Sequence, residues 1–174
     1  MEPLGPGSGR EAQSLFEEAR LLVARGEEEA ARAALDEALR REPTHRGALV
    51  LLARLLLEER EREAALATLD RALAAWPRSA EVRNERARCL HALGDHEAGL
   101  EEAQRARALL DSGDNFVQAG PVYLTLVWCL RDLRRYREAL ELAEEGLARV
   151  PDAILANWAA TVEEELAEAE KEEC

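Results

Sequence analysis

The sequence has few aromatic residues: phenylalanine, tryptophan and tyrosine together make up 4% of its 174 residues. Sheets favour aromatic and β-branched side chains, so this scarcity argues against a β-rich fold. Alanine, leucine, glutamate and arginine dominate instead, and all four are good helix formers or are tolerated well in helices. A chain of this length forms one domain and can bury a substantial core. The composition therefore predicts closely packed helices.

Long hydrophobic runs and a cysteine framework are also missing. No run reaches the roughly 18 apolar residues that span a bilayer, so neither a membrane span nor a membrane partner is predicted. Residues 1–10, MEPLGPGSGR, have no apolar centre and cannot form a signal peptide; we expect a disordered tail there. Cys89, Cys129 and Cys174 do not suggest disulfides. We therefore expect a cytoplasmic protein.

Positive charge is in deficit, since the formal net charge is −13. A nucleic-acid partner requires a basic face, so nucleic acid is excluded as a main partner. The last twelve residues, 163–174, hold seven glutamates and one lysine and carry −6 of the total. We interpret them as a solvated helix end, with a specific acidic docking tail as the alternative.

A 34-residue period organises the chain. The segment Gly26–Pro43 reads GEEEAARAALDEALRREP. Its apolar and closing residues, and those found 34 positions later, are Ala31, Leu35, Ala38, Leu39 and Pro43, then Ala65, Leu69, Ala72, Leu73 and Pro77. The period and the residue types resemble the tetratricopeptide repeat, a helix-turn-helix unit of about 34 residues.

This resemblance implies an all-α fold, a right-handed α-solenoid of four tetratricopeptide helix-turn-helix repeats with a C-terminal capping helix. The expected domain covers 11–171. Its parts are repeats 12–45, 46–79, 80–113 and 120–153, an insert loop at 114–119 that shifts the fourth repeat by six residues, and a capping helix at 153–171. The two helices of the first repeat are expected at about 11–25 and 28–41. The terminal helix would cover the apolar face of the last repeat.

The third repeat departs from the family pattern. Arg83 and Arg86 stand where the family places large apolar residues, and Asp111 replaces the closing proline. Its second helix is therefore expected to run on to about Leu110. At the helix starts we expect Thr44, Ser79 and Asp152 to act as N-caps.

No arrangement of residues predicts catalysis, and the GPGSG of the N-terminal tail is interpreted as linker rather than as a phosphate loop. The cluster most like a metal site is Cys89, His91 and His96. Because Cys89 and His91 are two apart on a helix, they point to different sides. We interpret the group as a buried thiol beside surface histidines, and we expect no cofactor and no metal.

Tetratricopeptide repeats bind extended peptides or helices in a concave groove lined by the first helix of each repeat. The corresponding positions predict a partner-binding groove of Phe16, Arg20, Val50, Leu51, Arg54, Asn84, Arg88, Leu124, Trp128 and Arg131. Large aromatic residues exposed in a groove indicate that a partner covers them. The alternative is that Phe16 packs under the N-terminal tail and Trp128 under the insert.

Three arginines recur at the ninth position of successive repeats. Arg20, Arg54 and Arg88 are 34 residues apart, so we expect them to form a column. One interpretation is that the column binds a carboxylate-bearing segment. The other is that each arginine pairs with a glutamate of its own helix: Glu17, Glu58 and Glu85, respectively.

The resemblance implies a non-catalytic protein–protein adaptor rather than an enzyme, with a protein or peptide as partner. The alternative is a structural protein that forms homo-oligomers through the groove and the terminal helix. Co-chaperone members of the family grip a C-terminal carboxylate with five basic or amide residues. All five positions differ in this chain: they hold Phe16, Arg20, Leu51, Glu81 and Glu85. That ligand is therefore not expected.

Overall fold

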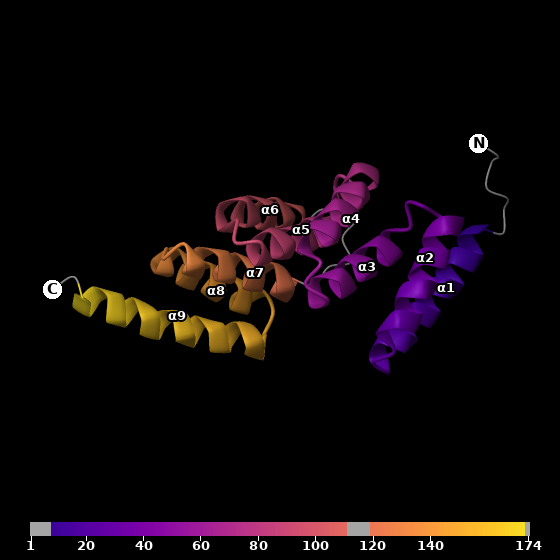
Figure 1. Cartoon of the computed structure of the whole chain (residues 1–174). Helices are drawn as coiled ribbons and strands as arrows, with labels where there is room; N and C mark the ends of the chain where they lie inside the picture. The colour runs from indigo at the N-terminus through magenta and orange to yellow at the C-terminus, as the bar shows by residue number, and fades with distance from the viewer. Residues whose placement is uncertain (1–7, 111–118, 173–174) are drawn as a thin grey trace. The chain divides into compact units, whose positions relative to one another are not determined.

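The structure is a computed structural model that describes residues 8–110 and 119–172. Every secondary-structure element in these two ranges is an α-helix, and nine are present (Figure 1). The first eight form four helix-turn-helix pairs, and the ninth follows alone. The all-α class and the plan of four repeats with a last helix are confirmed. None of the described helices is long and apolar enough to cross a membrane.

The first compact unit, Met1–Pro77, contains two helix pairs. They are α1 (Ser8–Ala24) with α2 (Glu28–Arg41), and α3 (Arg46–Glu58) with α4 (Arg62–Ala75). Small residues sit where the paired helices approach: Ala19, Ala31, Ala53 and Ala65 have no exposed surface. Helices that approach closely need such small side chains at the crossing, and leucines fill the space on either side.

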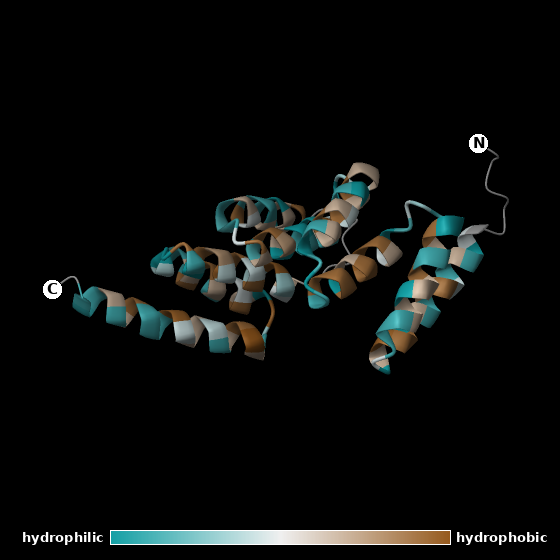
Figure 2. Ribbon diagram, viewed as in Figure 1, coloured by the Kyte–Doolittle hydropathy of each residue, from teal (hydrophilic) through white to brown (hydrophobic). Residues whose placement is uncertain are grey.

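The second unit, Arg78–Cys174, contains the other five helices. They are α5 (Ala80–Ala92), α6 (His96–Leu109), α7 (Ala119–Asp132), α8 (Tyr136–Arg149) and α9 (Ala153–Glu172). Helix α9 packs against α7 and α8, just as α7 packs against α5 and α6. It therefore lies where the first helix of a fifth repeat would lie. Its start is apolar and its end is hydrophilic (Figure 2).

The turn inside each helix pair has the same geometry. One residue in each turn has a positive φ: Gly26 (75°), Arg60 (64°), Gly94 (86°) and Arg134 (58°). In all four, the next residue donates its backbone N–H to the carbonyl five positions back, at 2.8–3.0 Å. This bond is the signature of a Schellman ending, which requires a left-handed residue. The first three turns are 34 residues apart, and the fourth is displaced by six more.

Helix starts agree with the expected caps in two cases and differ in one. Ser79 Oγ accepts a hydrogen bond from the Val82 backbone N–H at 3.3 Å, and Asp152 Oδ1 accepts one from that of Leu155 at 3.0 Å. The prediction for Thr44 is wrong. Helix α3 begins at Arg46, so its cap is His45, whose Nδ1 accepts from the Ala48 N–H at 3.1 Å.

Two expected boundaries need correction. Residues 8–10 of the expected disordered tail belong to α1, because Ala12 is fully buried and Glu11 pairs with Arg41 of α2 at 3.1 Å. Position 119, expected in the insert loop, is the first residue of α7. The remaining parts of the tail and of the insert, 1–7 and 114–118, lie outside the described residues. Helix α6 ends at Leu109 with Leu110 as its C-cap, close to the expected end.

A buried ion cluster joins the two helices of the third repeat. The side chain of Glu102 on α6 is 4% exposed and contacts three arginines. Arg83 of α5 lies 2.9 Å away and Arg86 lies 3.7 Å away, and Arg105 of α6 also pairs with it. The two arginines that broke the apolar pattern of this repeat therefore face a buried carboxylate between the helices.

Candidate binding face

The predicted groove residues of the first unit lie on α1 and α3, the first helices of their pairs. Three of them, Phe16, Leu51 and Arg54, are half-buried, and Arg20 is exposed. Val50 differs from the prediction. It is only 2% exposed, because its side chain turns into the packed interior, so it is not available to a ligand.

Phe16 packs on the start of α3. Its ring atoms lie 2.7–3.1 Å from where a Cβ on Gly47 would stand, and its ring centroid is 5.1 Å from that of His45. The guanidinium of Arg20 lies over the same ring, 5.9 Å from its centroid. A helix of the next repeat thus supports this aromatic side chain, and Gly47 provides the space for it.

The predicted groove residues of the second unit lie on α5 and α7. Arg88, Leu124, Trp128 and Arg131 are half-buried. Asn84 is 1% exposed and so differs from the prediction. An amide at this position of α5 lies within the helix packing rather than on the surface, and it cannot contact a ligand there.

Trp128 lies between aromatic side chains of two neighbouring helices. Its ring centroid is 6.2 Å from that of His91 on α5 and 5.9 Å from that of Trp158 on α9, the latter in an edge-to-face arrangement. Edge-to-face contacts are the favoured geometry for aromatic pairs. Helices α5, α7 and α9 therefore contribute one ring each to a continuous row.

Arg131 is held by the last helix. Its Nε donates to both carboxylate oxygens of Glu165 on α9, at 2.8 and 2.9 Å. This hydrogen-bonded carboxylate raises the pKa of Arg131 above its ordinary value. The guanidinium also lies over Trp158, 5.4 Å from the ring centroid. Glu165 follows Arg131 by 34 residues, so the contact joins equivalent positions of successive helices.

Arg20 and Arg88 each pair with the glutamate of their own helix that was expected. Arg20 pairs with Glu17 at 3.0 Å and Arg88 pairs with Glu85 at 2.9 Å. Glu85 is nearly buried, while the Arg88 side chain stays 40% exposed. The Arg20 side chain is 59% exposed. Both arginines thus reach their glutamates without leaving the surface.

The cysteine of the metal-like cluster is separated from the two histidines. Cys89 is fully buried and is not in a disulfide. His91 and His96 lie together, 4.9 Å between ring centroids, and both approach Asp132 at the end of α7. Burial lowers the pKa of His91 below its ordinary value, although its bond to Asp132 acts in the opposite direction. Sequence reasoning did not find Asp132, because it is 41 residues from His91.

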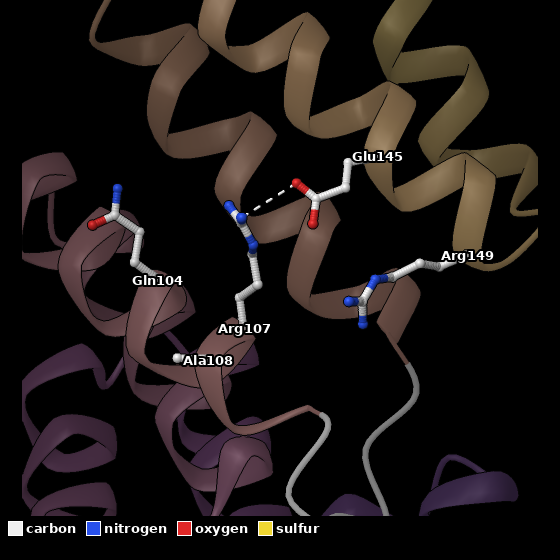
Figure 3. Close-up of a pocket in the computed structure, with 5 residues that line it drawn as sticks. All are labelled: Gln104, Arg107, Ala108, Glu145 and Arg149. Atoms are coloured by element: carbon white, nitrogen blue, oxygen red, sulfur yellow. Dashed lines mark ion pairs between the residues drawn. The ribbon is translucent and has the colours of Figure 1, made fainter.

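A surface pocket lies between α6 and α8, which are the second helices of the third and fourth pairs (Figure 3). Gln104, Arg107 and Ala108 of α6 line it on one side, and Glu145 and Arg149 of α8 on the other. Arg107 and Glu145 form an ion pair across it at 3.3 Å. Glu145 also accepts a hydrogen bond from the hydroxyl of Tyr123 at 2.6 Å. Glu145 of α8 thus bonds to residues of both α6 and α7.

Family models for the tetratricopeptide repeat match residues 22–75 and 50–115. Among curated proteins, no sequence matches the chain. The two family-model matches lie within the first three predicted repeats and the start of the insert.

Several solved structures have the same fold. The Pseudomonas aeruginosa pilF protein has a TM-score of 0.82 at 21% identity, over 93% of this chain and 72% of its own. MamA protein has a TM-score of 0.67 at 18% identity, over 94% of this chain and 88% of its own. YrrB, described as a TPR protein with an unusual peptide-binding site, has a TM-score of 0.62 at 20% identity, over 85% of this chain and 74% of its own. At these identities the likeness concerns the fold.

Proposed function

Because the chain belongs to the tetratricopeptide repeat proteins, we propose that it is a non-catalytic adaptor. It binds a peptide or helix of a partner protein on the faces formed by the first helices of its repeats. The relatives of known structure include a TPR protein described as having a peptide-binding site, which supports this class of function.

The exposure of Arg20 and Arg88 is the observation that carries the proposal. Each arginine directs Nη1 to a glutamate of its own helix, and 59% and 40% of the two side chains remain exposed. A guanidinium has five N–H donors in a fork that matches a carboxylate. One glutamate contact leaves donors for a second carboxylate. The partner segment is therefore acidic, and it contacts Arg20 in the first unit or Arg88 in the second.

Apolar and aromatic groups beside these arginines would supply the rest of the contact. Leu51 in the first unit and Leu124 and Trp128 in the second are half-buried. Their exposed parts offer area for apolar side chains of the segment, and aromatic residues often anchor such interfaces. Val50 and Asn84 do not belong to the face that we propose, since both are buried.

Selection of peptides on the intact chain, followed by affinity measurement, tests the proposal. We expect selected peptides to be rich in Asp and Glu. Arg20→Ala, Arg54→Ala and Arg88→Ala should be compared, because the peptide can lie on either unit. Loss of a charge-assisted contact costs about 1.5–3 kcal/mol, a roughly 10- to 150-fold loss of affinity. Arg71→Ala, at an exposed position of α4, is the matched control and should change affinity less than about twofold.

This function would be contradicted by a weakening of less than about threefold in all three variants while the helical content is unchanged. A peptide ending in EEVD tests a separate expectation, the exclusion of the co-chaperone type of clamp, and its micromolar binding would contradict that exclusion. The clamp positions include Glu85, a nearly buried carboxylate paired with Arg88, so a peptide carboxylate would be repelled there.

A second candidate function, self-assembly, is favoured by the shallow packing of α9. Only Leu155 and Val162 of this helix are buried, and Ile154 is 60% exposed. A helix held by so few buried residues can be exchanged with another copy of the chain. Light scattering across a concentration series separates the two functions. A constant monomer mass supports the adaptor, whereas an oligomer that is lost on deleting 153–174 supports self-assembly.

We also propose the cytoplasm as the compartment. Neither Cys89 nor Cys129 is in a disulfide, which is the state favoured in a reducing environment. Detection of the tagged chain in the cytosolic fraction would support this assignment, and its recovery with membranes or outside the cell would contradict it.

A further inference from the structure

Three side chains that bind metals well meet at the turn between α5 and α6. His91 is in the last turn of α5, His96 is the first residue of α6, and Asp132 is the last residue of α7. His91 Nε2 lies 2.8 Å from Asp132 Oδ2, and His96 Nδ1 lies 3.9 Å from the same oxygen. One ligand atom from each residue lies within 4.8 Å of the other two.

The fold fixes this arrangement through the turn and its cap. Gly94 takes a φ of 86°, which no ordinary side chain favours, and so reverses the chain between the two histidines. Asp95 then caps α6 by accepting a hydrogen bond from the Ala98 N–H at 3.1 Å. The two imidazoles consequently face each other across the turn. Helix α7 packs beside both α5 and α6 and brings Asp132 to them.

We propose that His91, His96 and Asp132 bind a divalent transition-metal ion of the Zn²⁺ class. Two imidazoles and one carboxylate are a common ligand set for such ions, with water in the fourth position. In a tetrahedral site with bonds of about 2.0–2.1 Å, ligand atoms are about 3.3 Å apart. The observed spacings of 2.8 and 3.9 Å lie on either side of that value. Small rotamer changes would therefore bring the three atoms onto one ion.

The local electrostatics favour a cation. His96 Nδ1 is buried and has no hydrogen-bond partner among the residues that the structure describes. Two of the three ligands are at helix C-terminal ends, where the backbone carbonyls carry partial negative charge.

A neighbouring cation, Arg131, does not occupy the site. Glu165 holds its Nε at 2.8 and 2.9 Å, and its contact to Asp132 is made at the other carboxylate oxygen, Oδ1, at 3.3 Å. Asp132 Oδ2 therefore stays directed to the histidines. Cys89 is fully buried, so the proposed ligands are nitrogen and oxygen only.

Titration of the metal-stripped chain with Zn²⁺ tests the site, using calorimetry and thermal unfolding together. We expect one site per chain, and a thermal midpoint that rises with Zn²⁺ because the ion binds only the folded form. His96→Ala and Asp132→Asn should each lower the affinity by about 100-fold or more, beyond the roughly 10- to 100-fold loss typical of outer-shell partners. X-ray absorption should show neighbours at about 2.0–2.1 Å and no sulfur at about 2.3 Å.

Two matched controls make the result specific. His45→Asn removes the third histidine of the chain and keeps a residue that can cap α3, and Asp36→Asn removes an exposed carboxylate of α2. Both should bind Zn²⁺ as the unaltered chain does. The proposal is overturned if no binding is seen, if a sulfur neighbour appears, or if His96→Ala or Asp132→Asn binds normally. It does not rest on the adaptor function, since no peptide enters the experiment.

Discussion

Arg83 of α5 donates a hydrogen bond at 2.9 Å to the carboxylate of Glu102 on α6, which is almost completely buried. The pair joins the two helices of the third repeat in the space where other repeats place apolar side chains. Breaking a buried ion pair leaves a charge without compensation, which is costly even where the intact pair adds little stability. The contact therefore makes this repeat sensitive to single substitutions.

Glu102→Ala should destabilise the chain strongly. It leaves Arg83 and its neighbour Arg86 without their common carboxylate, and we expect a loss of about 3–5 kcal/mol in the free energy of unfolding. Urea unfolding followed by circular dichroism measures this loss. Glu101→Ala, at the adjacent exposed position, should cost less than about 0.5 kcal/mol. Equal effects at the two positions would show that the buried cluster is unimportant.

Gly99→Leu should also destabilise the third repeat. A Cβ at Gly99 would lie 3.1 Å from the Ala87 carbonyl oxygen and 3.2 Å from Cys129 Sγ, so a large side chain has no room. Overpacking of this kind costs about 1–3 kcal/mol or more. The thermal midpoint should fall accordingly, whereas Ala108→Leu at an exposed position of the same helix should leave it nearly unchanged.

Gly26→Ala and Arg60→Gly should have opposite effects, although the two residues occupy the same turn position. Both have a positive φ, which costs about 1–2 kcal/mol for a residue with a Cβ. Gly26→Ala introduces that cost and should destabilise the chain. Arg60→Gly removes it and should stabilise the chain, by an amount that is reduced by the conformational entropy that glycine adds to the unfolded state. Chemical unfolding of the two variants checks the signs. The same sign for both would contradict the turn geometry.

Cys129 should be inert towards alkylation in the folded chain. Burial raises the pKa of its thiol to about 12, so the reactive thiolate is absent at neutral pH. In a Cys174→Ser background, iodoacetamide should modify neither remaining cysteine until denaturant is added, and mass spectrometry counts the adducts. Rapid modification of Cys129 in buffer would contradict its burial.

Stability should fall on mild acidification through His91. Its pKa is lowered in the folded chain, so below about pH 6.5 the unfolded chain binds the extra proton first. The His91 contribution is therefore absent above that pH and destabilising below it. In the presence of a chelator, the decrease in unfolding free energy from about pH 7.5 to about pH 5.5 should be smaller for His91→Gln than for the unaltered chain.

Much of the fold could be predicted because each repeat needs certain residue types at fixed positions of its own sequence. Ala31 and Ala65 recur at the crossing of each helix pair, and glycine marks two of the four turns. The third repeat could be placed only through its neighbours. Arg83 and Arg86 break its apolar pattern, and the carboxylate that they pair with, Glu102, lies on another helix. His45 displaced Thr44 as a cap because a one-residue shift of a helix start leaves almost no trace in the sequence.

The candidate face was less predictable than the fold. A repeat position indicates which helix a side chain belongs to, but burial depends on how the next repeat packs. That is why Val50 and Asn84 are inside. Trp158 and Glu165 could have been found, because α9 continues the 34-residue register from α7 and places Glu165 opposite Arg131. Asp132 offered no such signal, since its partners are histidines that belong to the preceding repeat.

The distribution of tryptophans gives each unit its own optical reporter. Trp76 is in the first unit, where its indole N–H donates to the Thr44 carbonyl at 2.8 Å, and Trp128 and Trp158 contact each other in the second. With Trp76→Phe, all tryptophan emission comes from the second unit; with Trp128 and Trp158 both replaced by phenylalanine, it comes from the first. Fluorescence can thus follow the melting of either half of the chain without an added dye.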